Sequence, residues 1–329
     1  MSKKILITGA AGFIGRLVTH ALSTRKYDLF LLVRPGTNPK KLGAVSEKIV
    51  ILEVDLRDIK KLRETINLYR FDTIIHIGAI RNRGRTSADD YFKANVQSTE
   101  QLAIRALETQ AKFIYFSSVG VFGNIPENTP ADNQSRKIGD NLYHESKIQS
   151  EKLINKYVLY GLNAVIIRPT ITYGTGDYGF PYGLINLINK GLLILPRPMP
   201  DIHLCNVEQL VQATQRLVEL DYKPGVTYNI GDRHPVNLLD LVDFISNELH
   251  EKSFSIQKTI PVSWFRFAER FFALIKCKTW QQRFQLFSHN WYYNVENAYE
   301  DLNLRDTETI PAIRSTIEWY QKTRKRKKT

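Results

Sequence analysis

The sequence predicts an α/β protein in which a doubly wound parallel sheet is joined to a smaller C-terminal domain. Short apolar runs alternate with segments of helical spacing through the first half of the chain, which is the pattern of buried parallel strands with crossover helices. A glycine-rich turn joins the first apolar run to the first helical segment. After residue 168 this rhythm stops and glycine, proline and tyrosine become dense, which indicates a change of domain.

The expected elements follow in order. Strands are expected at residues 5–7, 27–33, 48–56, 72–77, 112–117 and 163–168. Helices are expected from residue 13 onward and at 58–69, 88–109 and 141–160. One further strand at 226–231 and a helix at 238–249 lie in the second half. We expect function at the carboxyl ends of the strands, where such sheets form their ligand crevice.

Size and composition exclude several classes of protein. The chain has 329 residues, of which 43% are hydrophobic, enough to bury a substantial core and to exclude intrinsic disorder. Cys205 and Cys277 are the only cysteines, too few for a disulfide framework or a C-x-x-C metal site. We therefore expect no metal and a reducing, cytoplasmic location. No uncharged apolar run reaches the ~18 residues of a membrane span, and the first apolar run is a strand, not a signal peptide.

Two segments could contact a surface. The net charge is +13, and residues 322–328 carry six of these positive charges. This basic tail could bind nucleic acid or an acidic membrane, although a solvated, disordered end is the simpler interpretation, and we expect no specific nucleic-acid partner. Residues 263–290 are rich in tryptophan and phenylalanine, with charges at helical spacing. They would suit either the core of the smaller domain or contact with a hydrophobic substrate or a membrane surface.

The turn at residues 8–15 predicts a dinucleotide site. Gly9 lets the chain turn sharply, Gly12 lets the backbone approach a pyrophosphate, and Gly15 lets the helix pack close to the strand. The helix that begins at Phe13 and Ile14 then offers free N–H groups to the phosphates. Three glycines alone would fit a plain tight turn, but the flanking strand and helix favour the nucleotide site.

Tyr143 and Lys147 form the only Tyr-x-x-x-Lys spacing among the 16 tyrosines. Residues four apart share one face of a helix, and an ammonium beside a phenol lowers the pKa of the phenol. Such a tyrosine can exchange a proton with an alcohol or carbonyl. Ser118, 25 residues upstream at the end of an expected strand, could hydrogen-bond the same substrate oxygen. Without Ser118, an ordinary pair on a helix surface would be the simpler interpretation.

These motifs resemble those of the extended short-chain dehydrogenase/reductases, the NAD-dependent epimerase/dehydratase superfamily. The matching segments are TGAAGFIG at 8–15, Asp55, FSSVGVFG at 116–123, Tyr143 with Lys147, Arg168 with Pro169, and the C-terminal segment 294–320. The resemblance covers nearly the whole chain. It implies a Rossmann domain at 1–168 with a returning segment at 203–231, a substrate domain at 169–202 and 232–320, and a basic tail at 321–329.

The resemblance also implies a role for each matching residue. Tyr143 would be the general acid/base, Lys147 would lower its pKa and hold the nicotinamide ribose, and Ser118 would orient the substrate oxygen. Asn95 would complete the proton relay. The implied cofactor contacts are Gly9, Gly12, Phe13, Ile14, Gly15, Asp55 and Leu56 at the adenine, Gly78, Ala79, Tyr143, Lys147, and Pro169 at the nicotinamide. For each residue, capping, packing or turn formation is the alternative.

Cofactor choice depends on the end of the second strand. Family members that prefer NAD usually carry an acidic residue there, whereas this chain has Val33 and Arg34. Arg34 could pair with a 2′-phosphate and stack on adenine, helped by Lys40 and Lys41, unless it is simply an exposed arginine. We therefore expect NADP, with NAD as the alternative.

Two departures from the family pattern concern the substrate. The 4,6-dehydratases carry an Asp-Glu pair after the catalytic hydroxyl residue, whereas Val119 and Gly120 stand here, so no acid is placed for elimination. Nucleotide-sugar enzymes often show an asparagine after the sixth strand and an arginine before the strand at 203–207. Here Thr170 or its neighbour takes the first position, and Asp201 and Ile202 the second, with Arg197 near. A pyrophosphate clamp therefore remains an open question.

The sequence favours an NAD(P)-dependent oxidoreductase that moves a hydride between nicotinamide and a secondary alcohol or ketone. The small-molecule substrate we expect is hydrophobic, steroid-like or isoprenoid-like. The first alternative is a nucleotide-sugar epimerase that uses the same serine, tyrosine and lysine, and the second is a non-catalytic NADP-binding protein. A homodimer is implied by the resemblance alone.

Overall fold

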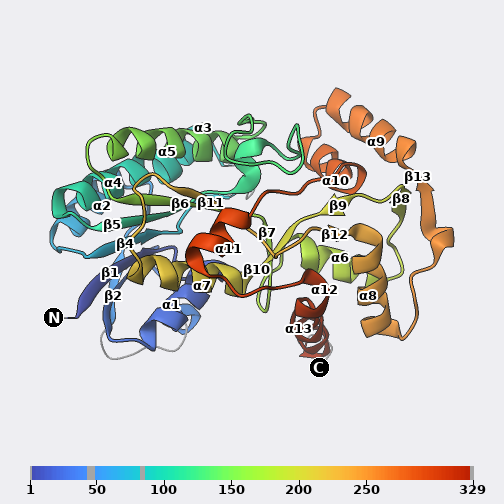
Figure 1. Ribbon diagram of the computed structural model, residues 1–329, viewed down its shortest axis with the longest axis horizontal. Coiled ribbons are helices and arrows are strands. Elements are labelled where there is room, and N and C mark those ends of the chain that lie inside the picture. The colour runs from blue at the N-terminus through green and yellow to red at the C-terminus, as the bar shows by residue number, and fades with distance from the viewer. Residues whose placement is uncertain (1, 43–48, 82–85, 327–329) are drawn as a thin grey trace.

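A seven-stranded parallel sheet forms the main body of the protein (Figure 1). The computed structural model describes residues 2–42, 49–81 and 86–326. The strand order is β11-β6-β5-β4-β1-β2-β3. The strands are β1 Lys3–Thr8, β2 Tyr27–Val33, β3 Ile49–Glu53, β4 Thr73–His76, β5 Lys112–Phe116, β6 Ala164–Pro169 and β11 Thr227–Ile230. All seven expected strands are therefore confirmed, although residue 48, where the third was expected to begin, lies outside the described residues.

Helices cover both faces of this sheet. One face carries α1 Phe13–Ser23, α7 Val207–Glu219 and α11 Glu296–Leu302, and the other carries α2 Ile59–Asn67, α4 Ser98–Thr109 and α5 Leu142–Val158. Side chains alternate between the two faces: Ile5 and Ile7 of β1 lie in the first core and Leu6 lies in the second. The order of the strands reverses at β1: β2 and β3 are added on one side of it, and β4, β5 and β6 on the other. The ligand crevice is therefore expected at the carboxyl ends of β1 and β4.

The expected helix at 88–109 forms in three consecutive pieces. It begins with α3, Ala88–Tyr91, continues as a π-helical segment, Phe92–Gln97, and ends as α4. Segments of π-helix inside α-helices frequently lie at functional sites. Asn95 lies in this segment.

The second body of the protein is built around a separate core of aromatic and aliphatic side chains, among them Tyr173, Trp291 and Tyr320. Its helices are α6 Phe180–Asn189, α8 Leu238–His250, α9 Val262–Leu274, α10 Lys278–Ser288, α12 Thr309–Ala312 and α13 Arg314–Arg326. Its strands pair two by two: β7 Ile171–Tyr173 with β10 Leu204–Asn206, β9 Asp201–Ile202 with β12 Val236–Asn237, and β8 Leu195–Arg197 with β13 Thr259–Pro261.

Short 3-10 turns lie at Pro39–Leu42, Val119–Phe122 and Ile256–Lys258. The exact domain boundaries stay a prediction.

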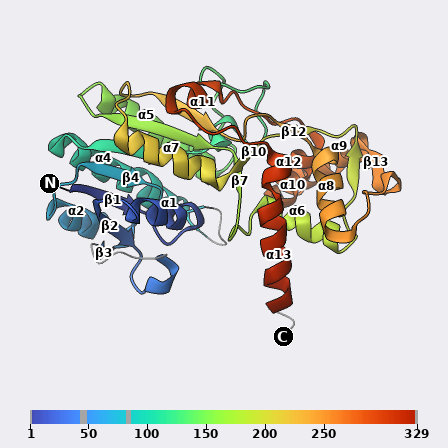
Figure 2. The same cartoon turned by 60° about the horizontal axis from the view of Figure 1, so that its bottom comes forward.

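The basic tail differs from the disordered end that we expected. Residues 322–326 continue α13, which runs outward to the C-terminus (Figure 2), and residues 327–329 lie outside the described part of the chain. Arg324 Nη1 donates a hydrogen bond of 3.0 Å to the hydroxyl of the buried Tyr320. This hydrogen bond ties the first turn of the tail to the core. Among the described residues, no helix combines the length and apolar character needed to cross a bilayer.

A buried ion pair joins α5 to the sheet. The Glu151 carboxylate accepts hydrogen bonds from Arg168 Nε and Nη2, both at 2.8 Å, and from Lys137 Nζ at 2.7 Å. The hydroxyl of Ser117, at the end of β5, donates a further bond of 2.6 Å. Burial opposes ionisation of Glu151, but Arg168 and Lys137 outweigh it and hold the pKa of this carboxyl below its usual range.

Glu151→Ala should destabilise the protein by about 3–5 kcal/mol, because it leaves the buried Arg168 without its counter-charge. The measurement is the free energy of unfolding in urea at neutral pH. Glu127→Ala is the matched control, since it removes an exposed partner of Arg136, 2.8 Å away, and should cost less than about 1 kcal/mol. Equal losses in the two variants would contradict the anchoring role of Glu151.

Candidate functional site

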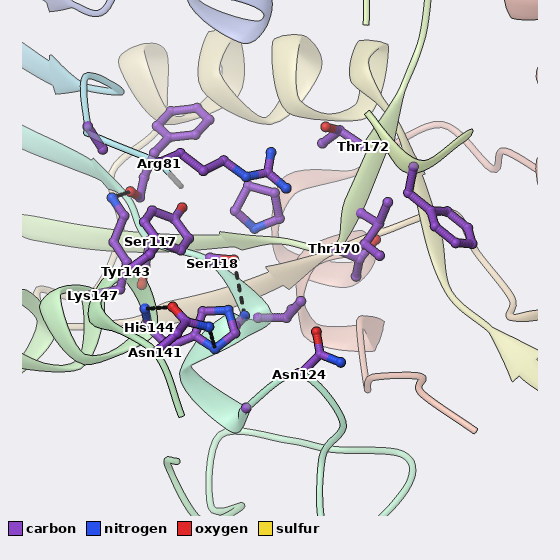
Figure 3. A pocket seen from close by; sticks show the side chains of 18 of the residues that line it. Arg81, Ser117, Ser118, Asn124, Asn141, Tyr143, His144, Lys147, Thr170 and Thr172 are labelled. Carbon is purple, nitrogen blue, oxygen red and sulfur yellow. Dashed lines mark hydrogen bonds between the residues drawn. The ribbon is translucent and has the colours of Figure 1, made fainter. Parts of the chain in front are cut away.

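A cavity of about 400 Å³ opens at the carboxyl ends of β4, β5 and β6, against the second body (Figure 3). Its walls come from the segments that follow these strands, from the start of α5, and from α10. The lining residues used below are Ile14, Ala79, Arg81, Ser118, Gly120, Asn124, Tyr143, His144, Lys147, Pro169, Thr170, Thr172, Gln282, Leu286, Trp291 and Tyr293. The crevice therefore lies where the strand pattern predicted it.

The glycine turn leaves no room for side chains at two of its positions. Gly9 has a φ of +72°, and a Cβ there would lie 2.7 Å from the Cα of Gly78. A Cβ on Gly15 would lie 2.1 Å from the carbonyl oxygen of Gly9. Gly9 directly follows β1, so the missing side chain of Gly15 lets α1 pack against the chain at the end of this strand, as expected. Gly12 caps α1 without a side-chain hydrogen bond, so the first N–H groups of the helix are available to a phosphate, and these residues fit a dinucleotide.

A buried chain of hydrogen bonds holds the ends of β1 and β4 together. The N–H of Gly78 donates to Thr8 Oγ1 at 3.0 Å, and Thr8 Oγ1 lies 2.7 Å from His76 Nδ1. His76 Nε2 lies 3.0 Å from Thr99 Oγ1, which donates to the carbonyl of Asn95 at 2.5 Å. Because the Thr99 proton is used there, His76 donates from Nε2 and accepts at Nδ1. Burial lowers the pKa of His76 to about 3, so the ring is neutral.

Asn95 uses its whole amide group to position neighbouring segments. Its Oδ1 accepts the N–H of Ile80 at 2.7 Å, and its Nδ2 donates to the carbonyl of Ile80 at 3.0 Å and to Ser146 Oγ at 2.9 Å. These bonds tie the loop after β4, which carries Ala79, to α5. Its part in a proton relay stays a prediction.

The structure brings Ser118, Tyr143 and Lys147 to one wall of the cavity (Figure 3). Lys147 Nζ lies 5.9 Å from the centre of the Tyr143 ring and donates to the carbonyl of Phe116 at 2.5 Å. Ser118 caps the 3-10 turn at Val119–Phe122, where its Oγ accepts the N–H of Gly120 at 3.0 Å. Three of the four predicted catalytic residues are therefore neighbours in space as well as in motif.

The pKa of Tyr143 moves opposite to our expectation. Burial raises this pKa, and the Arg81 charge and the Ser118 hydroxyl lower it by less. Lys147 does not lower the pKa of Tyr143 as we expected, because burial also disfavours the charged form of Lys147. Burial lowers the pKa of Lys147 to about 7, against the opposing effect of Glu151. Lys147 is thus only partly charged near neutral pH, and its proton points at the Phe116 carbonyl.

The expected adenosine end carries two arginines. Arg34 directly follows β2, with its side chain exposed. Asp55, after β3, accepts from Arg57 Nε at 3.1 Å and Arg57 Nη2 at 2.8 Å. Arg57 is the main cause that holds the pKa of Asp55 below its usual range, and the charge of Arg34 adds to it. Leu56 packs beside Gly78, where a Cβ would lie 2.9 Å from Leu56 Cδ1. The contact of Asp55 with adenine stays a prediction. Arg57 was not among the residues predicted for this site.

His144 is a lining residue that the sequence did not identify. Asp140 Oδ1 bonds its Nδ1, and Asn141 Oδ1 accepts its backbone N–H at 2.9 Å. Burial raises the pKa of Asp140, but the His144 contact and backbone N–H groups bring the net value below the usual range. A Cβ on Gly120 would lie 2.5 Å from His144 Nε2, so Gly120 makes room for the imidazole. Gly120 was the sequence feature that could have indicated space for this side chain. We had interpreted it only as the absence of an acid at that position.

The cations that line the cavity are Arg81 and Lys147 among the described residues. Arg81 reaches inward from the loop after β4 (Figure 3). The described lining does not include Arg197, and Asp201 accepts a hydrogen bond of 3.0 Å from Asn237 Nδ2. Thr170 and Thr172 line the wall after Pro169. The arginine position that we considered for a pyrophosphate clamp therefore lies outside this wall, and Arg81, which we missed, faces the cavity.

Comparisons with known proteins agree with this geometry. The sequence profile described as "NAD dependent epimerase/dehydratase family" matches residues 5–231. The N-acetyl-α-D-glucosaminyl-diphospho-ditrans,octacis-undecaprenol 4-epimerase of Escherichia coli O157:H7 is 26% identical over 277 residues, covering 80% of this chain and 77% of that protein. The dTDP-glucose 4,6-dehydratase of Neisseria meningitidis serogroup B is 25% identical over 346 residues, covering 97% and 93%.

A solved structure shows the same fold. The UDP-glucuronic acid 4-epimerase of Bacillus cereus, in complex with NAD, superposes with a TM-score of 0.72 at 20% identity, over 97% of this chain and 99% of that one. The match of the profile to more than half of the chain confirms the resemblance drawn from the motifs, and the curated relatives are enzymes. The chain is an NAD(P)-dependent enzyme and belongs to the NAD-dependent epimerase/dehydratase family.

Proposed function

We propose that the protein is an epimerase that oxidises and re-reduces a secondary hydroxyl of a glycosyl diphosphate. The observation that carries this proposal is the meeting of Ser118, Tyr143 and Lys147 on one wall of the cavity. Ile14, in the first turn of α1 and between the glycines of the turn, lines the same cavity. Relatives that act on diphosphate-linked sugars favour a sugar over the steroid-like substrate that the sequence suggested. Polar lining residues support the same choice, namely Arg81, Asn124, Thr170 and Thr172.

The roles of the three residues follow from their hydrogen bonds. The Oγ of Ser118 accepts a hydrogen bond from the Gly120 N–H, so its own hydroxyl can donate a hydrogen bond to the substrate oxygen. Tyr143 Oη would take the proton of the reacting hydroxyl and later return it. Lys147 would hold the ribose and, when charged, favour the phenolate. The nicotinamide, when bound, supplies the hydride acceptor and donor.

Arg81 would contact the diphosphate of the substrate. Arg81 is the exposed cation on the described lining, and its guanidinium reaches into the cavity. A guanidinium offers a planar fork of donors that suits phosphate oxygens. The homodimer suggested by the family resemblance stays a prediction beside this proposal.

A second candidate function is dehydration of the same class of substrate. Elimination needs an acid beside the catalytic hydroxyl residue, and the His144 ring fills the space next to Gly120, two residues after Ser118. Asp140 orients that ring through Nδ1, which leaves Nε2 on the side of Gly120. Incubation with UDP-N-acetylglucosamine separates the two candidates: epimerisation returns a C4 epimer, and dehydration returns a keto sugar.

The cofactor that we propose is NADP. Arg34 and Arg57 stand at the carboxyl ends of β2 and β3, where the adenosine ribose of a dinucleotide is expected. Arg57 is engaged with Asp55, whereas the Arg34 side chain is exposed. A 2′-phosphate would therefore find its partner in Arg34.

Tyr143→Phe should reduce turnover on the order of 10²- to 10⁴-fold, because it removes the proton-transferring hydroxyl and little else. Turnover is followed by chromatography of the product sugars, and cofactor affinity by quenching of protein fluorescence. Affinity should stay within about twofold of the wild type, since the ring remains. Tyr160→Phe, an exposed hydroxyl beyond the end of the same helix, is the control and should be neutral. Turnover of Tyr143→Phe within threefold of the wild type would remove this residue from the mechanism.

Arg34→Asp should weaken NADPH binding more than NADH binding, because it replaces a partner of the 2′-phosphate with a repelling charge. The expected shift in the ratio of dissociation constants is about tenfold to a few hundredfold, given roughly 1.5–3 kcal/mol for a hydrogen bond to a charged group. The ratio is measured at fixed ionic strength. Lys190→Asp makes the same charge change at the end of α6 and should leave the ratio unchanged. A wild type that prefers NADH, with a ratio that does not move, would show that the enzyme uses NAD.

A further inference from the structure

The outer face of α9 is apolar and exposed. Four of its side chains are largely open to solvent, namely Trp264 at 63%, Phe267 at 64%, Phe271 at 48% and Leu274 at 82%. Their spacing of three, four and three residues places them on one face of the helix. We call these four residues the α9 face. Ile275 and Trp280, also exposed, extend the apolar surface past the end of the helix.

This exposure does not come from incomplete packing of the helix. The opposite side of α9 is packed on α10, where the Phe265 ring lies 5.7 Å and the Phe272 ring 5.6 Å from that of Phe284. Phe272 also stacks on Trp280 at 5.9 Å. The helix thus has one satisfied apolar side and a second apolar side that faces outward. Large exposed apolar patches mark interaction sites.

Cations flank the α9 face. Arg266 and Arg270 are both exposed and, with Val262, Ser263 and Phe267, line a shallow hollow along the helix. Further cations follow at Lys276, Lys278 and Arg283. The single acid of this segment is Glu269, which turns inward to His289 Nε2 at 3.0 Å and Gln285 Nε2 at 3.0 Å. The outward charge is therefore positive.

The helix that supports this face also lines the cavity. Gln282 and Leu286 of α10 belong to the cavity wall. Asn124, another lining residue, donates from Nδ2 to the carbonyl of Gln282 at 3.2 Å and to Gln285 Oε1 at 2.9 Å. A surface that binds the α9 face would hence lie one helix away from the cavity. Figure 1 shows α9 at the outer edge of the second body, with α10 between it and the sheet.

We propose that the α9 face docks on the surface of an anionic lipid membrane, and that the glycosyl diphosphate handled in the cavity is carried there by a lipid. Trp, Phe and Leu beside a row of arginines is the composition of a helix that lies in a bilayer interface, with its apolar face among the acyl chains and its cations at the headgroups. A second copy of this chain would carry the same positive charge on the same face, which disfavours self-association through it. The part of this inference that concerns the substrate rests on the proposed function.

The docking is tested by co-sedimentation of the full chain with vesicles of phosphatidylglycerol and phosphatidylcholine in equal parts. The wild type should bind these vesicles, bind pure phosphatidylcholine weakly, and be released by salt, since screening weakens headgroup attraction. Arg266→Gln with Arg270→Gln should bind roughly 30-fold more weakly, at about 1 kcal/mol for each cation. Trp264→Ser with Phe267→Ser should abolish binding.

The matched control is Leu159→Ser with Tyr160→Ser, which removes two apolar side chains that are at least as exposed, just beyond the end of α5. This variant should bind as the wild type does. All of these side chains are exposed, so the melting temperature of each variant should stay close to that of the wild type. Its measurement checks that the variants are folded. Absence of vesicle binding by the wild type, or equal binding by the α9 variants, would overturn the docking. A change of mass of the α9 variants in solution without vesicle binding would identify the face as a contact between copies and would also overturn it.

Turnover separates this inference from the proposed function. The α9 variants should convert water-soluble UDP-N-acetylglucosamine at the wild-type rate and should lose activity on a polyprenyl-diphospho-N-acetylglucosamine carried in the same vesicles. Vesicle binding by a wild type that converts neither sugar would refute the proposed function and leave the docking intact. Equal activity of the wild type and the α9 variants on the vesicle-borne sugar would refute the lipid-carried substrate.

Discussion

The pairing of Glu151 with Arg168 is the contact on which the catalytic geometry depends. Tyr143, Lys147 and Glu151 are spaced by four residues and lie along one side of α5. Glu151 binds Arg168 of β6 and the hydroxyl of Ser117, which directly precedes Ser118. One carboxylate therefore fixes the helix, the neighbouring strand and the turn that carries the third catalytic residue. A buried ion pair adds less stability than its Coulomb energy suggests, because both charges lose water. Its contribution here is the register of α5 on the sheet, and Glu151 also keeps the pKa of Lys147 from falling further.

A second constraint acts at the point where the strand order reverses. The turn after β1 and the segment after β4 approach so closely that neither Gly9 nor Gly78 has space for a side chain. The Thr8 hydroxyl bridges the same gap between Gly78 and the neutral His76. Backbone contact and a directed chain of hydrogen bonds thus hold the two strand ends rigidly beside the expected dinucleotide site. The first-turn N–H groups of α1 are positioned by that contact, since Gly15 packs on the carbonyl of Gly9.

The parts of the fold that could be predicted are those encoded by local pattern. Each strand of the main sheet is a short apolar run between turn residues, so its position could be identified without knowing its neighbours. The strands of the second body have only two or three residues each, and their pairing joins segments distant in sequence. Helix α7 carries a clear apolar period, with Leu210, Ala213 and Leu217 buried, although it was not among the predicted helices. At the site, motif residues came together as expected, whereas Arg57, Arg81 and His144 depend on tertiary neighbours. The pKa of Tyr143 was predicted in the wrong direction because the sequence does not reveal that burial affects the phenol and Lys147 together.

The aromatic segment had two interpretations, core or surface, and the structure contains both on one helix. Phe265 and Phe272 build the contact with α10, and Trp264, Phe267, Phe271 and Leu274 face outward. The outward-facing side chains bear on the choice of substrate, if the protein docks on a membrane and acts on a glycosyl diphosphate as proposed. The cavity wall combines hydroxyl, amide and guanidinium groups, which suit a sugar and a phosphate, with apolar side chains such as Phe180, Leu286 and Trp291. A lipid carrier would instead remain in the bilayer beneath the α9 face, so the same enzyme could act on an isoprenoid-linked substrate without an isoprenoid pocket. The surface beside the site would then account for the hydrophobic substrate that the sequence suggested. The polar groups of the cavity would be the ones that contact the sugar.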